Sequence, residues 1–390
     1  MGATRGHLPL IPAQDGWRVG VLFSESGTTV VTETEHLRGT ELAIAEINAA
    51  GGVLGRPIVP TVYDPGARNA DYLAFARRML AEDDLDIIFG CSMSASRKTV
   101  LPIVERHNGL LFYPSMYEGF EYCENVFYCG ATVNQTCLPL ADYLIRNYGG
   151  RVYFVGCDYI FPRESNRIMQ ELIEARGGEV VGETYVPLDA GEDAVSALIP
   201  KIRTAAPDVV FSTLVGTTAQ AFYRLYDAAG FDRTRHPVAS LTMAETEIAT
   251  IGRAACTGHI LAATYMQTVD NAENARFVAA FKARFGADAT TSIWSEAAYM
   301  QVHLFARALA RVGSADPRRI ALDPLGDEFD TPEGRVRVDV DTRHLWLTPR
   351  IGIATGEGLF DIVWESRVAV RPDPYLAATR IEESALDAWI

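Results

Sequence analysis

The chain has 390 residues, of which 48% are hydrophobic and 22% are charged, and its formal net charge is −15. This length predicts two domains, because single hydrophobic cores rarely grow beyond about 250–300 residues. The composition excludes an intrinsically disordered chain. The negative charge, without any Lys- or Arg-rich stretch, argues against direct binding to nucleic acid, which needs clustered positive charge.

The first third of the chain alternates between strand and helix patterns. Residues 17–24 form an apolar, β-branched run that ends in "ESGTT", which predicts a strand followed by a loop. Residues 36–52 carry apolar side chains at helical spacing and stop at two glycines, which predicts a helix and its end. The same alternation predicts strands at 56–64, 85–90, 109–114 and 125–130 and helices at 70–83 and 94–108.

A second alternating series begins at about residue 137. It predicts helices at 137–149, 163–177, 193–207 and 217–230 and strands at 151–157, 178–187, 208–216 and 236–244. The last third breaks this rhythm, because two helices are followed by segments that look like antiparallel strand pairs. These are the helices at 274–286 and 292–313 and the strand segments at 333–355 and 359–366.

Near-continuous apolar strands separated by helices indicate parallel sheets with both faces covered. We therefore expect an α/β protein with two doubly wound lobes, the first ending near residue 130. In such sheets, ligands bind beyond the carboxyl ends of the strands. Polar and aromatic residues gather at these ends, as Ser92, Ser94, Ser96, Tyr113, Ser115 and Tyr117 in the first lobe and in 157–165, 212–218 and 240–247 in the second.

The chemistry of these strand ends favours binding over catalysis. The sequence contains neither GxGxxG nor GxxxxGK[ST], so no phosphate-binding loop is predicted, and it has no GxSxG nucleophile motif. The seven histidines are scattered and the six cysteines show no CxxC spacing, so we expect no metal, no cofactor and reduced thiols.

Other interpretations stay open for single residues. Ser94 could serve only as a helix cap, and Tyr159 and Phe161 could serve only as packing between the lobes. An amide hydrolase could in principle combine Cys91 or Cys157 with Glu245 and Lys98.

Several longer motifs carry a family resemblance that covers residues 17 to 375. They are "VLFSESG", "RGTELAIAEINAAGGVLGRPI", "GCSMSASRKTVLPIVERHNGLLFYPSMYEGFEY", "NVFYCGATVNQT", "GCDYIFPRESN", "DVVFSTLVGTT" and "VRPDPY". With these motifs the chain resembles the type I periplasmic-binding-protein-like receptors. Within them it resembles the amide-binding negative regulators of aliphatic amidase operons, and the urea-binding proteins of ABC transporters are similar too.

The resemblance implies a Venus-flytrap fold, with two lobes joined by three crossings near 131–137, 263–270 and 336–343. The implied lobes are 1–134 with 267–338 and 135–266 with 339–390. The small-amide site that the resemblance implies consists of Ser92, Ser94, Tyr113, Ser115, Met116 and Tyr159, with Thr242 and Glu245 from the second lobe.

Three positions depart from the family's pattern. The regulators carry tyrosine where this chain has Ser92, proline where it has Met116 and tyrosine where it has Phe161. The loss of a ring at Ser92 is expected to enlarge the pocket or change its polarity. Hydroxyls and main-chain groups can satisfy a neutral amide or urea, whereas Glu245 would accept from an NH₂ group or select a cation such as guanidine.

We therefore expect an amide or urea sensor that closes on its ligand. The resemblance implies an RNA-binding antitermination regulator as its protein partner. Residues 1–17 lack the apolar segment of a secretory signal and no stretch is long enough to span a membrane, so we expect a cytoplasmic protein. The alternatives are a periplasmic carrier of urea or short amides for an ABC permease, if a leader was removed, and the hydrolase. A homodimer is the commonest oligomer and is expected on that ground alone.

Overall fold

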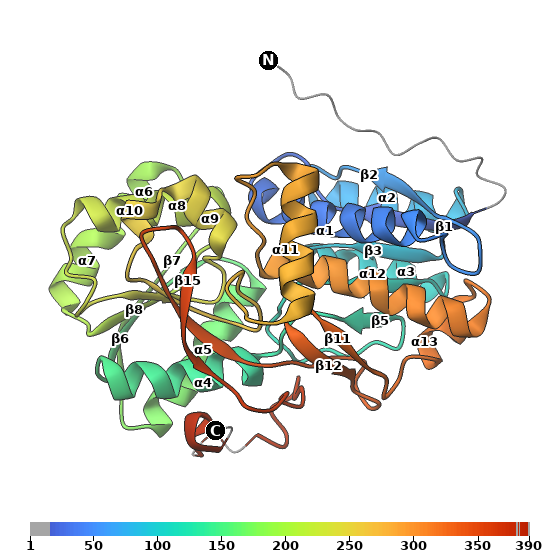
Figure 1. Ribbon diagram of the computed structural model, residues 1–390. Helices are drawn as coiled ribbons and strands as arrows, with labels where there is room; N and C mark the ends of the chain where they lie inside the picture. The colour runs from blue at the N-terminus through green and yellow to red at the C-terminus, as the bar shows by residue number, and fades with distance from the viewer. Residues whose placement is uncertain (1–15, 380, 382, 389–390) are drawn as a thin grey trace.

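The structure, a computed structural model, describes residues 16–379, 381 and 383–388. Two α/β lobes lie side by side, and the chain passes between them more than once (Figure 1). The expectation that no leader precedes the first strand concerns residues 1–15, which lie outside the described residues. The outer limits of the predicted lobes, 1 and 390, lie outside them as well.

The first lobe is built on a sheet in the order β2-β1-β3-β4-β5, in which every pairing is parallel. Every residue of β3 and β4 is buried, which explains their uninterrupted apolar sequences. The strands are β1 Trp17–Leu22, β2 Ile58–Tyr63, β3 Ile87–Gly90, β4 Leu110–Tyr113 and β5 Val126–Tyr128. The helices around this sheet are α1 Val30–Ala49, α2 Asn69–Ala81, α3 Ser94–Arg106, α11 Ala272–Phe285, α12 Ile293–Val312 and α13 Pro317–Leu322.

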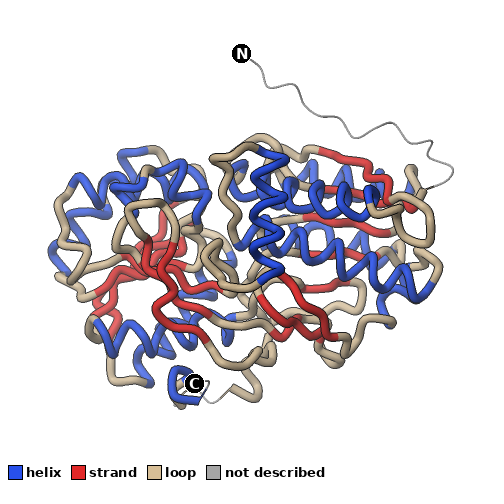
Figure 2. The backbone as a smooth tube through the Cα atoms, viewed as in Figure 1, coloured by secondary structure: helices blue, strands red, loops and turns tan. Residues whose placement is uncertain are grey.

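Aromatic packing fixes α12 to this sheet, although α12 lies more than 160 residues after β5 in the chain. Phe112 stacks on Phe127 with ring centroids 5.1 Å apart, and Phe89 lies 5.2 Å from Phe112. Phe305 of α12 meets Phe89 edge-on at 5.5 Å. Burial of such rings contributes more than their area alone, because edge-to-face pairs are favourable. The late helix therefore belongs to the first lobe, where Figure 1 labels α12 beside β3. Figure 2 shows that helices surround the strands in both lobes.

The second lobe is built on a sheet in the order β15-β14-β10-β9-β8-β6-β7. Its pairings are parallel from β10 to β7, whereas β14 and β15 run antiparallel, as their sequences predict. The strands are β6 Arg151–Cys157, β7 Glu179–Val186, β8 Val209–Thr213, β9 Val238–Ser240, β10 Ile260–Ala263, β14 Arg350–Ala354 and β15 Phe360–Glu365. The helices are α4 Val133–Asn147, α5 Ile160–Ala175, α6 Glu192–Ser196, α7 Leu198–Ala205, α8 Gly216–Ala228, α9 Glu245–Ile251, α10 Arg253–Cys256 and α14 Ala385–Ala388.

A small antiparallel sheet, β11-β12-β13, lies beside the first lobe. Its strands are β11 Glu328–Thr331, β12 Gly334–Val338 and β13 Leu345–Trp346. The chain passes between the large sheets after β5, after β10 and between β13 and β14. The last passage comes a few residues later than 336–343, because the small sheet continues to the end of β13 at Trp346. The predicted fold class, two doubly wound lobes joined by three crossings, is confirmed, and the predicted lobe boundaries stay a prediction.

Arg350 ties two of these passages together. Its guanidinium donates to the carbonyl oxygen of Thr264 after β10, and to the carbonyl oxygen of Glu333 at 2.8 Å. It also pairs with Glu365 at 2.6 Å. Burial raises the pKa of Glu333 to about 7 although Arg350 lowers it, and burial also raises the pKa of the neighbouring carboxyl of Glu296. The crossings therefore enclose one guanidinium and two buried carboxyl groups.

Candidate ligand-binding cleft

The turns that follow strands of both large sheets enclose a cavity of about 50 Å³. The first lobe contributes the start of α1, the turns after β3 and β4, and α12. The second lobe contributes the segments after β6, β8 and β9. The lining residues are Thr29, Thr32, Ser92, Met93, Ser94, Ser115, Met116 and Trp294 from the first lobe and Tyr159, Phe161, Leu214, Val215, Gly216, Ala219, Thr242, Met243, Glu247 and Ile251 from the second.

Ser92 lies in the turn between β3 and α3, and Tyr113 supports that turn from behind. Cys91, the residue before it, has a left-handed backbone with φ of +64°. The Tyr113 hydroxyl donates to the Ser92 carbonyl oxygen at 2.7 Å, and the ring is fully buried. Ser115 Oγ donates to Ser92 Oγ at 3.4 Å, so the two lining hydroxyls adjoin each other. Tyr113 is not among the lining residues and its hydroxyl supports the Ser92 turn, so its predicted contact with the ligand stays a prediction.

Ser94 connects the cavity to a buried ionic network. It is the first residue of α3, so the N-cap position belongs to Met93 and not to Ser94. Its hydroxyl donates to Glu118 and accepts from Arg97 at 3.3 Å. Arg97 is fully buried and pairs with Glu121 at 2.7 Å. Burial opposes ionisation of Glu121, yet Arg97 and Lys98 lower its pKa to about 2. The Ser94 hydroxyl is therefore held in one orientation by fixed charges.

The second lobe supplies the opposite wall of the cavity. Tyr159 and Phe161 stand side by side with ring centroids 6.3 Å apart, after the end of β6. Thr242 Oγ1 donates to the carbonyl oxygen of Leu214 at 3.1 Å. Both aromatic residues lie in the lining, so contact with a ligand and packing between the lobes both stay open for them.

The acidic residue of the cavity is Glu247, and the predicted Glu245 lies outside the lining. Glu245 Oε1 accepts from the backbone N–H of Gln267 at 2.8 Å, and burial raises the pKa of Glu245 to about 8. Glu247 lies two residues further along α9, where its carboxylate meets the N–H of Ala244 and the indole of Trp294. Residues two apart on a helix point in different directions, which separates the two carboxyl groups.

Six of the predicted residues are thus brought together in one lining: Ser92, Ser94, Ser115, Met116, Tyr159 and Thr242. Sequence reasoning missed Thr32 and Trp294, because both lie within helices and not directly after a predicted strand. It also missed Glu247, which occupies the third helical position and accepts from the Ala244 N–H. Alanine at the N-cap gives no capping-box pattern in the sequence, so no such signal marked this residue.

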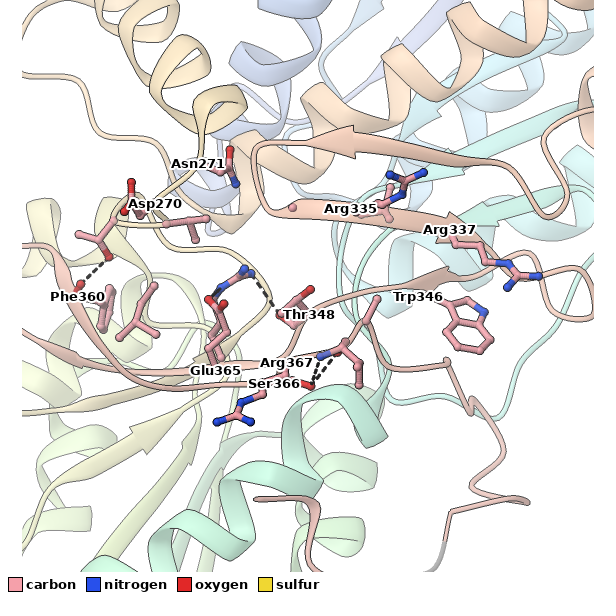
Figure 3. A pocket seen from close by; sticks show the side chains of 18 of the residues that line it. Asp270, Asn271, Arg335, Arg337, Trp346, Thr348, Phe360, Glu365, Ser366 and Arg367 are labelled. Atoms are coloured by element: carbon pink, nitrogen blue, oxygen red, sulfur yellow. Dashed lines mark hydrogen bonds and ion pairs between the residues drawn. The ribbon is translucent and has the colours of Figure 1, made fainter. Parts of the chain in front are cut away.

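A wider depression of about 940 Å³ lies between the small sheet and β15 (Figure 3). Four of its eight charged side chains pair with one another, Arg335 with Glu328 and Arg350 with Glu365. It is far larger than the enclosed cavity, but it lies away from the carboxyl ends of the parallel strands. We therefore place the ligand site in the smaller cavity, where side chains of both lobes converge.

The cysteines of the hydrolase alternative are poorly suited to attack a substrate. Burial raises the pKa of the Cys157 thiol to about 11, and that of the Cys91 thiol still further. Neither residue lies in the cavity lining, and Lys98 is paired with Glu121 at 2.8 Å. Across the described residues no group of three or more His, Cys, Asp or Glu side chains could hold a metal ion, and no helix is long and apolar enough to cross a membrane.

The periplasmic binding protein domain family matches residues 17–380 of this chain. The chain therefore belongs to the periplasmic binding proteins, a class of two-lobed proteins that the fold and the cleft already define. The structure is similar to a solute-binding protein of an ABC transporter from Rhodopseudomonas palustris HaA2, solved with p-hydroxybenzoic acid, with a TM-score of 0.84. That likeness has 20% sequence identity and covers 94% of this chain and 100% of the other.

Curated relatives match more locally. A leucine-, isoleucine-, valine-, threonine- and alanine-binding protein from Pseudomonas aeruginosa is 24% identical over 309 residues, which cover 77% of this chain and 80% of the relative. A limonene hydroxylase from Geobacillus stearothermophilus is 30% identical over 127 residues. That match covers 33% of this chain and only 23% of the relative's length.

Proposed function

We propose that this protein is a solute-binding protein whose lobes close on a small, uncharged amide or urea-like molecule for delivery to an ABC permease. One observation carries the ligand class: a cavity of about 50 Å³ whose polar side chains are seven hydroxyls, one indole and one carboxylate. A buried water needs at least about 10–15 Å³, so the cavity favours a small molecule over a large one. Urea and acetamide are small molecules of this kind, and p-hydroxybenzoic acid is larger.

The charge of the lining supports an uncharged ligand. Among the described residues that line the cavity none is lysine, arginine or histidine, and Glu247 is acidic. A carboxylate ligand would be desolvated beside another carboxylate with no cation to pair it, which is strongly unfavourable. An NH₂ group can donate to Glu247, and a carbonyl oxygen can accept from the hydroxyl of Ser92, which itself accepts from Ser115. Every polar atom of a small amide thus has a partner.

Calorimetric titration with acetamide, butyramide, urea, guanidinium, p-hydroxybenzoate and isoleucine tests the proposal. We expect acetamide or urea to bind and raise the melting temperature, butyramide to bind more weakly and the two carboxylates not to bind. Binding of p-hydroxybenzoate or isoleucine with acetamide and urea silent would overturn the ligand class.

The transport role draws on the family and on the transporter proteins with which this chain shares its fold. The regulatory role, the antitermination partner, the cytoplasmic location and the homodimer stay predictions. Fractionation of cells that express the complete gene separates the two roles. A protein recovered from the periplasm supports transport, whereas one that stays in the cytosol and co-purifies with an RNA-binding protein supports regulation.

A further inference from the structure

Glu247 receives hydrogen bonds from both lobes at once. It belongs to α9 of the second lobe, and Thr32 Oγ1 of α1 donates to its Oε1 at 3.1 Å. Trp294 Nε1 of α12 donates to its Oε2 at 3.2 Å. Both donors are first-lobe residues. The backbone N–H of Ala244 and the hydroxyl of Thr246, on its own lobe, donate to Oε2 at 3.1 and 3.2 Å. Four donors therefore converge on one carboxylate beside the cavity.

The two lobes also approach closely next to this carboxylate. Gly216, at the start of α8, has φ of +61°, and a Cβ atom there would lie 2.4 Å from the carbonyl oxygen of Thr28. Thr28 precedes α1, the helix that carries Thr32. Glycine at 216 thus permits the backbones of the two lobes to come together close to the hydrogen bonds that Glu247 accepts from the other lobe.

The bonds across the cleft involve no ligand atom, so they form whenever the lobes meet. Hydrogen bonds to an ionised carboxylate are stronger than those between neutral groups, and water weakens them little here because Glu247 and Trp294 are buried. Burial raises the pKa of Glu247, while the indole, the hydroxyl and the backbone N–H lower it. The donors therefore compensate a carboxylate that the cavity would otherwise leave desolvated.

We propose that Glu247 is a positioning residue that latches the lobes together beside the cavity, so that the protein populates its closed form before ligand binds. The Thr32–Glu247–Trp294 set is called the latch below. Most of the ligand-free protein is then already closed. A ligand that binds only the closed form therefore loses little affinity, because only the small open fraction must close first. The ligand class rests on the proposed function, but the latch does not, since it acts in the empty protein.

The test measures the distance between the lobes in the full chain without ligand, by energy transfer between one label on each lobe. Trp294→Phe keeps a ring and removes the indole donor, Thr32→Val keeps the shape and removes the hydroxyl, and Glu247→Gln keeps the size and removes the charge. We expect each variant to shift the ligand-free population toward larger distances, with Glu247→Gln largest. Trp17→Phe is the matched control, because the Trp17 indole donates to the Val53 carbonyl oxygen at 2.8 Å within the first lobe.

A second readout links the latch to binding. In titrations with acetamide or urea, whichever binds, we expect Thr32→Val to weaken the affinity by about tenfold, because the fraction of closed protein falls about tenfold. The distance between the lobes at saturating ligand should equal that of the parent protein. Identical ligand-free distances in the parent and all three latch variants would overturn the latch, whatever the ligand. Failure of every ligand to bind, with the distances shifted as expected, would overturn the proposed function and leave the latch standing.

Discussion

Ser94 occupies the first position of α3, between the cavity and the buried guanidinium of Arg97. Because Glu118 and Arg97 fix its hydroxyl, a ligand that bonds to Ser94 meets a prepared partner and does not have to order one. We expect Ser94→Ala to weaken binding of the preferred amide by about 1–3 kcal/mol, because a buried hydrogen bond is lost and Glu118 keeps one partner fewer. Calorimetry measures this difference.

Ser96→Ala is the control for that substitution. Ser96 lies two residues later on the same helix, where its hydroxyl donates to the Met93 carbonyl oxygen at 2.8 Å outside the lining. Equal losses of affinity in Ser94→Ala and Ser96→Ala would show that the effect comes from α3 and not from a ligand contact.

Ser92 decides how much room the cavity has. A phenol ring in its place would exceed the available volume of about 50 Å³. We expect Ser92→Tyr to abolish binding of acetamide and urea with no loss of the folded state, and Ser92→Ala to retain a weakened site. Calorimetric titration measures the loss of binding, and a thermal melt shows whether the variant is still folded. Tight binding by Ser92→Tyr would show that the ligand lies elsewhere in the cleft.

At the residue scale, the sequence predicted positions that follow strands better than positions on helices. Ser92 and Ser115 were predictable because a buried strand must end in a turn that faces the crevice. Glu247 was not identified, because one turn of helix carries two acidic residues and their directions depend on where α9 begins. The structure places that beginning at Glu245, which turns its own side chain toward Gln267.

At the element scale, the parallel strands and most helices were predicted, because continuous apolar runs and 3.6-residue periodicity come from burial itself. β10 was missed because its four residues, Ile260–Ala263, include two alanines and are too short to stand out. α9 was missed because seven residues give less than two full turns of pattern. Short elements of this kind are stabilised by their neighbours more than by their own sequence.

Substitution of Arg350 tests how much this residue stabilises the crossings between the lobes. Its removal leaves the carboxyl groups of Glu296 and Glu333 buried without their guanidinium, so we expect Arg350→Met to lower the free energy of unfolding by about 3–5 kcal/mol. Thermal unfolding in a calorimeter measures it, because urea is itself a proposed ligand. Arg335→Met is the control, since Arg335 pairs with Glu328 on the exposed face of the small sheet and should cost at most about 1 kcal/mol. Equal losses of unfolding free energy in the two variants would show that Arg350 stabilises the fold no more than an exposed arginine does.

At the scale of the whole molecule, Glu333 makes stability depend on pH. Its pKa is about 7 in the fold against 4.5 as the ordinary value, so the folded state binds the extra proton between these values. The stability from Glu333 is fully present below pH 4.5 and is lost as the pH rises toward 7. Buried histidines such as His36, whose pKa burial lowers to about 3, act in the opposite sense across part of this range.

The difference between two variants isolates the glutamate. We expect the free energy of unfolding of Glu333→Gln to fall less between pH 4.5 and pH 7 than that of the parent protein, as measured by denaturation at intervals of pH. Glu328→Gln, on the neighbouring strand with its side chain 45% exposed, should follow the parent curve. A Glu333→Gln curve parallel to the parent would show that this carboxyl does not titrate in the fold.

The enclosed cavity between the lobes has a kinetic consequence. Most of its lining residues are buried, so a bound molecule is largely covered while the lobes touch. Dissociation must then wait for a motion of the protein, and the rate of lobe opening sets an upper limit on how fast any occupant leaves. Such domain motions commonly take microseconds to milliseconds. Ligands of different affinity should share this ceiling, which makes residence time a property of the hinge as much as of the ligand.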